Sequence, residues 1–280
     1  MDPGYLMHPG DLMQPGYLMQ PGYLMQPGYL MHPGYLMHPG HLMLPAGANG
    51  VARLLQVAAP WATPRALGLL LLREDPQSAR IAADRRAALV DAALEDGARI
   101  ADSVSKRWGR EPDRIALRGG VSVSECDTEQ GWGATVVYAE YLERPARVRL
   151  FRPAIARLDR GLAEPGVRRI TGIERARSAL LAHELYHHFD AVRDGVPLAR
   201  RHRVTLLRFG AWQWTSGLVS LAEIAAGAFA QRLLGLRWHP RFFDIITVHA
   251  ADPQAATRMV AALREDNAHD FAAAERGLAL

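Results

Sequence analysis

Residues 178–189 read Ser-Ala-Leu-Leu-Ala-His-Glu-Leu-Tyr-His-His-Phe, a mostly apolar run that contains the pattern HExxH. Residues four apart lie on one face of a helix, so His183 and His187 can offer two imidazoles to one metal ion. Glu184 leans toward the same position. The pattern is the signature of a zinc hydrolase, and apolar neighbours are typical of a buried active-site helix. The alternative is a chance match on a core helix whose histidines are hydrogen-bonded.

The ends of this helix are also indicated. Thr171 followed by Glu174 has the spacing of a capping box, which predicts a helix start. Asp194-Gly195 with Pro197 beyond it predicts the stop. We therefore expect roughly twenty helical residues with HExxH near the middle.

A catalytic zinc ion usually has three protein ligands, so a third ligand is needed elsewhere in the chain. Glu223 is the only acid in the apolar helical run 220–235. A carboxylate on a buried face is costly unless a cation compensates it. We predict Glu223 as the third ligand, and expect the small residues 225–227 to let its helix approach the first closely. The alternative is that Glu223 reaches the helix edge or pairs with an arginine.

Four other side chains are weaker candidates. Asp190, three residues past His187, is expected to support a ligand histidine from behind. His188 points about 100° around the helix from His187 and should face elsewhere. His249 is expected to be structural. Cys126 could cap the metal as a thiolate, although an inert half-buried thiol is the simpler interpretation.

The two helical runs together resemble a known family. The segment HELYHHF at 183–189 with the later pattern Glu-x-x-Ala-x-x-Phe-Ala-x-x-Leu-Leu at 223–234 is similar to the ImmA/IrrE family of bacterial zinc metallopeptidases. The resemblance covers roughly residues 92–240. It includes a helical segment at 92–107, the segment 111–123, and two strand-like runs at 133–141 and 147–151.

This resemblance implies that His183, His187 and Glu223 bind zinc and that Glu184 is the general base. The implied fold is a helix-rich α+β, zincin-like domain with a small sheet packed on the HExxH helix. The implied substrate is another protein, such as a DNA-binding transcriptional repressor. The run 134–141 could bind the substrate backbone at a sheet edge, or could be an ordinary half-buried strand.

The chain departs from the family in two ways. The interval between the two helical runs is long, and we expect a loop there that contains Arg200-Arg-His-Arg203 and Trp212-Gln-Trp214. We also find no helix-turn-helix segment. The alternative function is a non-catalytic, zinc-stabilised binding module that regulates a partner. Because a structural zinc site needs no general base, the presence of Glu184 favours the enzyme.

The remaining sequence divides the chain into three parts. Residues 1–45 contain a Pro-Gly hexapeptide repeated seven times, a period that forms no regular core and predicts disorder. Residues 46–75 are expected to be an apolar linker or a packed helix. Charges and prolines interrupt them, so they are too short for a membrane span. Residues 76–280 are expected to form the metallopeptidase domain.

The charge pattern and the cysteine count indicate the binding partners and the cellular compartment to expect for the protein. Its 32 arginines, against the single Lys106, are interspersed with acids, as on solvated helical faces. The cluster at 200–203 is the one local exception, and we expect neither direct nucleic-acid binding nor membrane association. Cys126 is the only cysteine, which excludes an intramolecular disulfide and is compatible with the reducing cytoplasm. Nothing in the sequence indicates an oligomeric state.

Overall fold

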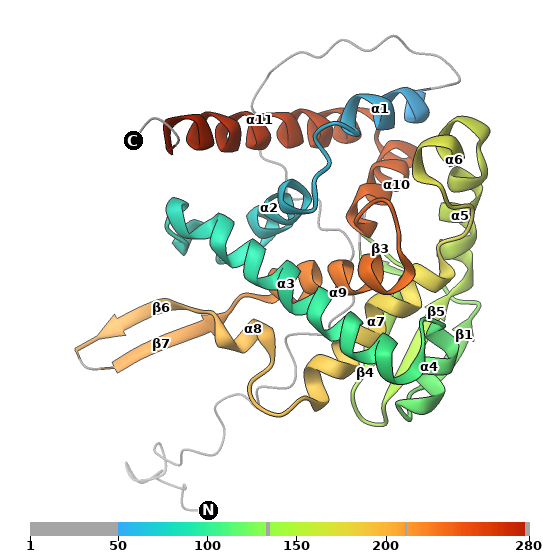
Figure 1. Ribbon diagram of the computed structural model, residues 1–280, viewed down its shortest axis with the longest axis horizontal. Helices are drawn as coiled ribbons and strands as arrows, with labels where there is room; N and C mark the ends of the chain where they lie inside the picture. Colours follow the sequence, from blue (N-terminus) through green and yellow to red (C-terminus); the bar gives the residue numbers. More distant parts are fainter. Residues whose placement is uncertain (1–49, 133–134, 211, 278–280) are drawn as a thin grey trace, which may run out of the picture.

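The computed structural model describes residues 50–132, 135–210 and 212–277, so the expected disorder of residues 1–45 lies outside the described residues. The fold is helix-rich α+β, as the sequence predicts. Figure 1 shows the arrangement of the elements. The helices are α1 (Gly50–Ala58), α2 (Pro64–Glu74), α3 (Ala83–Trp108), α4 (Pro112–Arg118), α5 (Arg152–Ala163), α6 (Pro165–Thr171), α7 (Arg177–Val192), α8 (Leu198–Arg201), α9 (Val219–Leu234), α10 (Asp244–Ala251) and α11 (Pro253–Gly277), with short 3-10 helices η1 (Ser78–Arg80) and η2 (Pro240–Phe243).

The strands form one small sheet and two hairpins. They are β1 (Ser122–Cys126), β2 (Gln130–Trp132), β3 (Thr135–Val137), β4 (Ala139–Leu142), β5 (Arg147–Phe151), β6 (Arg203–Phe209) and β7 (Trp212–Gly217). The sheet has the order β1-β5-β4, in which β5 runs parallel to β1 and antiparallel to β4. Helix α7 packs against β4 and β5. The expected sheet against the HExxH helix is therefore present, with β4 at its edge.

Helix α7 carries the HExxH residues near its middle, but it begins later than expected. The capping-box prediction is wrong, because Thr171 ends α6 and its hydroxyl donates to backbone carbonyls of its own turn. Gly172, with φ 75°, then turns the chain out of α6. The new helix starts at Arg177. Asp159 supports this start by accepting the N–H of the preceding Ala176 at 2.7 Å.

Helix α9 lies against both α3 and α7 and is buried around most of its circumference. Helix α9 packs against α7, as we had expected, and its small residues also face other elements. Gly97 of α3 faces the carbonyl oxygen of Ala225, and a Cβ added at Gly97 would lie 2.0 Å from that oxygen. Gly227 instead faces the imidazole of His239. The closest approach of α9 is therefore to α3.

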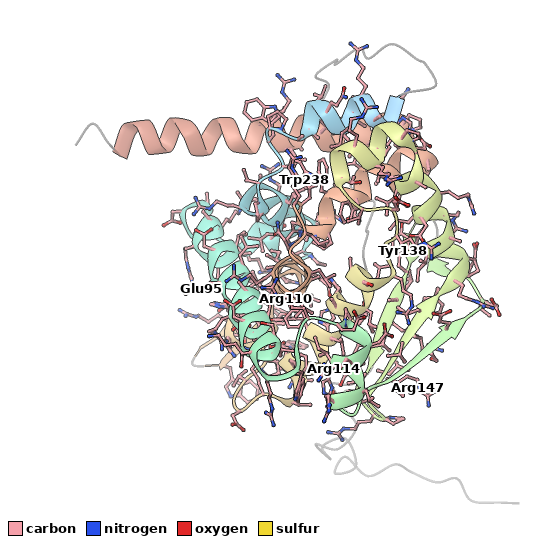
Figure 2. All side chains as sticks on the ribbon, turned by 45° about the vertical axis from the view of Figure 1, so that its right-hand side comes forward. Glu95, Arg110, Arg114, Tyr138, Arg147 and Trp238 are labelled. Atoms are coloured by element: carbon pink, nitrogen blue, oxygen red, sulfur yellow. The ribbon has the colours of Figure 1, made fainter. Side chains whose placement is uncertain are left out.

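We expect Gly97→Ala to lower the free energy of unfolding by about 1–3 kcal/mol, because backbone must move to admit the methyl group. The greater helix propensity of alanine offsets only part of this cost. Urea unfolding checks the change. The control is Glu95→Ala on the outer face of the same helix (Figure 2), which should stay within about 0.5 kcal/mol of the parent. Equal stability of the two variants would contradict the close contact.

The long interval between α7 and α9 forms regular structure. The prediction of a loop is wrong: α8 is followed by the antiparallel hairpin β6–β7, which extends away from the helical body (Figure 1). A β-rich run, Val204-Thr-Leu-Leu-Arg-Phe209, supplies the first strand. Gly210, with φ 58°, allows the turn. No helix in the described part of the chain is long and apolar enough to cross a membrane.

Candidate metal centre

Three buried side chains from two helices converge on one point. His183 and His187 lie one turn apart on α7, and Glu223 comes from the first turns of α9. The Nε2 atom of His183 is 3.0 Å from Glu223 Oε2 and 3.4 Å from His187 Nε2. His187 Nε2 is also 3.4 Å from Glu223 Oε1. The packing of α7 against α9 thus unites the three residues that the sequence singled out.

The spacing of these atoms fits a metal ion. A tetrahedral zinc ion with bonds of about 2.0–2.1 Å has ligand atoms roughly 3.3 Å apart. Two facing imidazole nitrogens cannot both donate to each other, and Glu223 can only accept when ionised. A cation at the point of convergence satisfies all three lone pairs. The group His183, His187 and Glu223 could therefore hold a metal ion.

The electrostatics of the group are those of ligands that need a cation. Burial lowers the pKa of His187 to about 4, so this imidazole is neutral and keeps its lone pair. Burial opposes the charge of Glu223 as well, but the neighbouring histidines outweigh it and lower the pKa of this carboxyl. For His183, burial is outweighed by the hydrogen bond and charge of Glu223, which raise its pKa. A metal ion would compete with a proton at this nitrogen.

Glu184 lies beside the group and close to the sheet edge. It is 1% exposed, and the nearby backbone of Tyr141 in β4 favours its ionised form. Its Oε2 atom has no hydrogen-bond partner among the described residues. Burial raises the pKa of Glu184 to about 8, and the charges of Glu223 and Glu140 add to this effect. A cation at the three-residue group would oppose the rise and favour the ionised carboxylate.

Asp190 does not support a ligand histidine, contrary to the prediction. Its oxygens accept the N–H of Leu198 at 3.0 and 3.2 Å, and it forms an ion pair with Arg193. The side chain therefore faces α8 and the end of α7. The spacing from His187 predicted that Asp190 lies near the candidate metal position along the helix. It did not specify toward which neighbour the Asp190 side chain points.

The other three candidates lie outside the group. His188 faces away from it, as expected, and its Nδ1 is 3.1 Å from the hydroxyl of Tyr141. His249 is half-buried on α10 beside Gly50 of α1. Cys126 is half-buried at the end of β1 and does not belong to the cluster of possible ligands.

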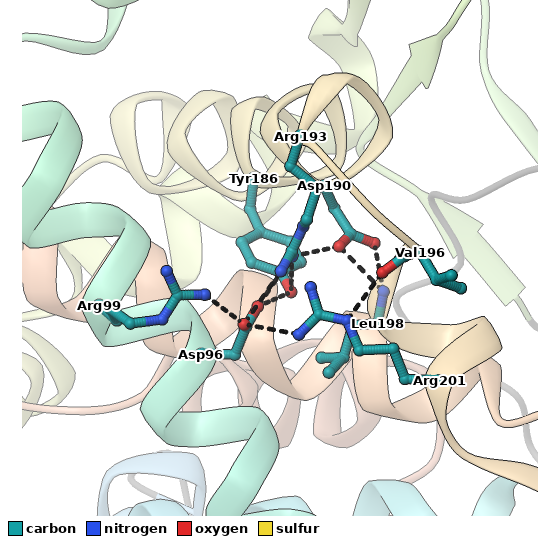
Figure 3. Close-up of polar contacts among 8 residues, drawn as sticks. All are labelled: Asp96, Arg99, Tyr186, Asp190, Arg193, Val196, Leu198 and Arg201. Atoms are coloured by element: carbon teal, nitrogen blue, oxygen red, sulfur yellow. Dashed lines mark hydrogen bonds and ion pairs between the residues drawn. The ribbon is translucent and has the colours of Figure 1, made fainter.

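A buried polar network behind α7 was not predicted from the sequence (Figure 3). Tyr186 donates its hydroxyl to Asp96 of α3 at 2.9 Å. Arg193 donates to both oxygens of Asp96 at 3.0 and 2.8 Å and also pairs with Asp190. Burial would raise the pKa of Asp96, but hydrogen bonds led by the one from Arg193 lower it to about 2. The network ties α7 to α3.

A second ionic cluster lies on the Glu223 side of the group. Arg241 of η2 is 3% exposed and pairs with Asp244 of α10 and Glu74 of α2. Its positive charge contributes to the lowered pKa of Glu223. The spacing of Arg241 and Asp244, three residues apart, was the only sequence signal for this cluster, and surface pairs show the same spacing.

Comparisons with known proteins add nothing to the site, because no family model, no curated protein and no solved structure matches the chain. The functional interpretation therefore rests on the residues and their geometry.

Proposed function

We propose that the protein is a zinc-dependent metallopeptidase that hydrolyses peptide bonds of a protein substrate. The observation that carries this proposal is the convergence of His183, His187 and Glu223 with Glu184 directly beside them. Two imidazoles and one carboxylate are a ligand set typical of catalytic zinc, with a further position for water. Manganese, cobalt or iron can bind the same donors, so zinc itself is part of the proposal.

The roles of the residues follow from their chemistry. When bound, zinc polarises the substrate carbonyl and lowers the pKa of a water molecule toward neutrality. Glu184 accepts a proton from that water and passes it to the leaving amine. The nearby backbone of Tyr141 in β4 favours the ionised form of the Glu184 carboxylate. The edge strand β4 is the candidate for binding substrate backbone in extended form.

The identity of the substrate remains a prediction. A DNA-binding repressor is the substrate that the family resemblance implies, and the geometry of the site does not select one protein over another. The absence of direct nucleic-acid binding and a cytoplasmic location also stay predictions from the sequence.

One observation favours the alternative function, a zinc-stabilised module without activity. The proposed ligands and Glu184 are all at most 7% exposed, and a catalytic centre must admit its substrate. The presence of Glu184 favours the enzyme, because a structural zinc site needs its ligands but no general base. The effect of substituting Glu184 therefore separates the two functions.

The metal content of the purified chain tests the ligand set. We expect one zinc ion per wild-type chain, and a fall to near zero in His183→Ala and in Glu223→Ala, because each change removes one of three ligands. Elemental analysis measures the ratio. His188→Ala is the matched control, since this histidine lies on the same helix but bonds Tyr141, and it should retain zinc.

Two outcomes would count against this proposal. Zinc retained in Glu223→Ala would place the third ligand elsewhere. A wild-type chain that takes up no zinc during purification or on addition of the ion would make the HExxH interpretation wrong.

A further inference from the structure

The hairpin β6–β7 exposes four large apolar side chains. Leu207 and Trp214 are about two-thirds exposed, at 65% and 64%, and Phe209 and Trp212 nearer the turn are 91% and 83% exposed. The other large apolar side chains exposed among the described residues are Leu117, Val192 and Val196. More than half of this class of exposed side chain is therefore concentrated on one two-stranded element.

The register places these four side chains together. Phe209 is opposite Trp212, and Leu207 is opposite Trp214. Because alternate residues of a strand point to the same face, the two pairs are adjacent on one face of the hairpin. The face is contiguous and apolar, and its exposure increases toward the turn.

The base of the hairpin is held firmly by the body of the protein. Arg80 donates to the carbonyl of Leu206 at 3.1 Å, at a register irregularity of β6. Gly217 packs so closely on the backbone of Ala199 that an added Cβ would lie 2.3 Å from its carbonyl oxygen. The end with the turn stands away from the helices (Figure 1). The apolar face is therefore presented by an ordered, anchored element.

The charged residues in the chain segment that contains the hairpin are all basic. No acid lies between Asp194 and Glu223, whereas that interval contains the four arginines 200, 201, 203 and 208. The formal net charge of the whole chain is also +4, so acids and bases balance in the remainder. The hairpin and the preceding helix α8 thus combine exposed aromatic rings with an excess of arginines, although Arg201 pairs with Asp96 of α3. This excess of basic side chains favours an anionic partner.

We propose that β6–β7 is a membrane-surface anchor that inserts Phe209 and Trp212 into the interface of an anionic lipid bilayer. Aromatic rings are favoured at that depth, and arginines are attracted by the negative surface potential of anionic lipids. This inference goes beyond the proposed function. It also replaces our expectation of no membrane association, which was based on helical spans and does not apply to a hairpin.

The observations favour lipid over the other occupants. A second copy would bring its own hairpin arginines, Arg203 and Arg208, against those of the first, and like charges oppose that contact. A single-stranded nucleic acid needs arginines that follow its phosphates, but Arg203 already donates to Thr215, and Arg201 to Val196 and Asp96. An anionic bilayer attracts these charges at a distance and needs no shaped groove.

Vesicle flotation with the full chain tests this proposal. Wild type is expected to bind vesicles of phosphatidylglycerol and phosphatidylcholine at least about tenfold more tightly than phosphatidylcholine alone. The double variant Phe209→Ser/Trp212→Ser should lose at least about tenfold in binding, because the inserted apolar area is removed. Arg208→Gln should weaken binding to anionic vesicles by about fivefold and reduce its salt dependence.

The matched control is Leu117→Ser, which removes a 78% exposed apolar side chain from α4 and should leave binding unchanged. Zinc content shows whether each variant retains its fold, and vesicle binding does not depend on peptidase activity. Several results would overturn the proposal: no binding to either vesicle, full binding by the double variant, or tighter binding of a single-stranded oligonucleotide. A dimer that the double variant dissociates would identify the face as a contact between copies.

Discussion

Glu184→Gln is expected to reduce peptide hydrolysis by about 10²–10⁴-fold while zinc content stays at the wild-type level. The amide keeps the size of the side chain but cannot accept a proton from water. The measurements are cleavage of an unstructured protein substrate and elemental analysis of the same sample.

The control for this prediction is Glu143→Gln, just past the end of β4, where the side chain is 61% exposed. The same chemical change there should leave the rate unaltered. A Glu184→Gln rate within about twofold of wild type would exclude Glu184 as general base, and would suggest that any cleavage comes from a contaminant. A zinc-loaded wild type without activity on any unfolded protein or peptide would favour the binding module.

Arg193→Met is expected to lower the free energy of unfolding by about 3 kcal/mol, because it leaves buried carboxylates without their main cation. Arg193 is 12% exposed and bridges Asp96 and Asp190. The value is at the low end for a broken buried pair, since Arg99 and Arg201 still face Asp96. Chemical denaturation at neutral pH measures the loss.

Arg99→Met is the matched control, because Arg99 also bonds Asp96 but its side chain is 61% exposed. We expect a loss below about 1 kcal/mol, as for other exposed ion pairs. Equal losses in the two variants would show that the buried position of Arg193 has no special importance.

The ion pair between Asp96 and Arg193 predicts how the free energy of unfolding changes in acid. The pKa of Asp96 is about 2 in the folded protein, below its ordinary value of 3.8. The contribution of the ionised Asp96 to the free energy of unfolding is therefore fully present above pH 4. It is lost as the pH falls toward 2, by about 2 kcal/mol in all. In Arg193→Met, the free energy of unfolding should depend less on pH in this acidic range. An unchanged acid slope would contradict the role of Arg193 at Asp96.

The sequence predicted the convergence of His183, His187 and Glu223 because much of the underlying geometry is local. His183 and His187 share a face on any helix, and the helix itself follows from the apolar run around them. Glu223 is different, since its meeting with α7 depends on tertiary packing. It was predictable because the only acid in a mostly apolar helix requires a compensating charge. The small sheet was also predicted, from the short strand-like runs before the helix.

The errors have a common physical origin. Thr171 and Glu174 have capping-box spacing, but Gly172 places a chain reversal between Thr171 and the helix. Asp190 has the right spacing from His187, yet Arg193 and the N–H of Leu198 attract it to the other side. In each case the spacing in the sequence matched a common pattern, but the side chain bonds other groups, which the spacing does not specify.

By itself, the sequence determined which side chains could bind a metal ion, on which helix two of them lie, and which carboxylate lies beside them. These properties depend on residue type and on contacts within a turn. Only the tertiary structure decided that Tyr186 of α7 bonds Asp96, 90 residues away, and that α9 lies on α3 at Gly97. It also decided that four apolar side chains of the hairpin remain exposed, because burial depends on how all the other elements pack.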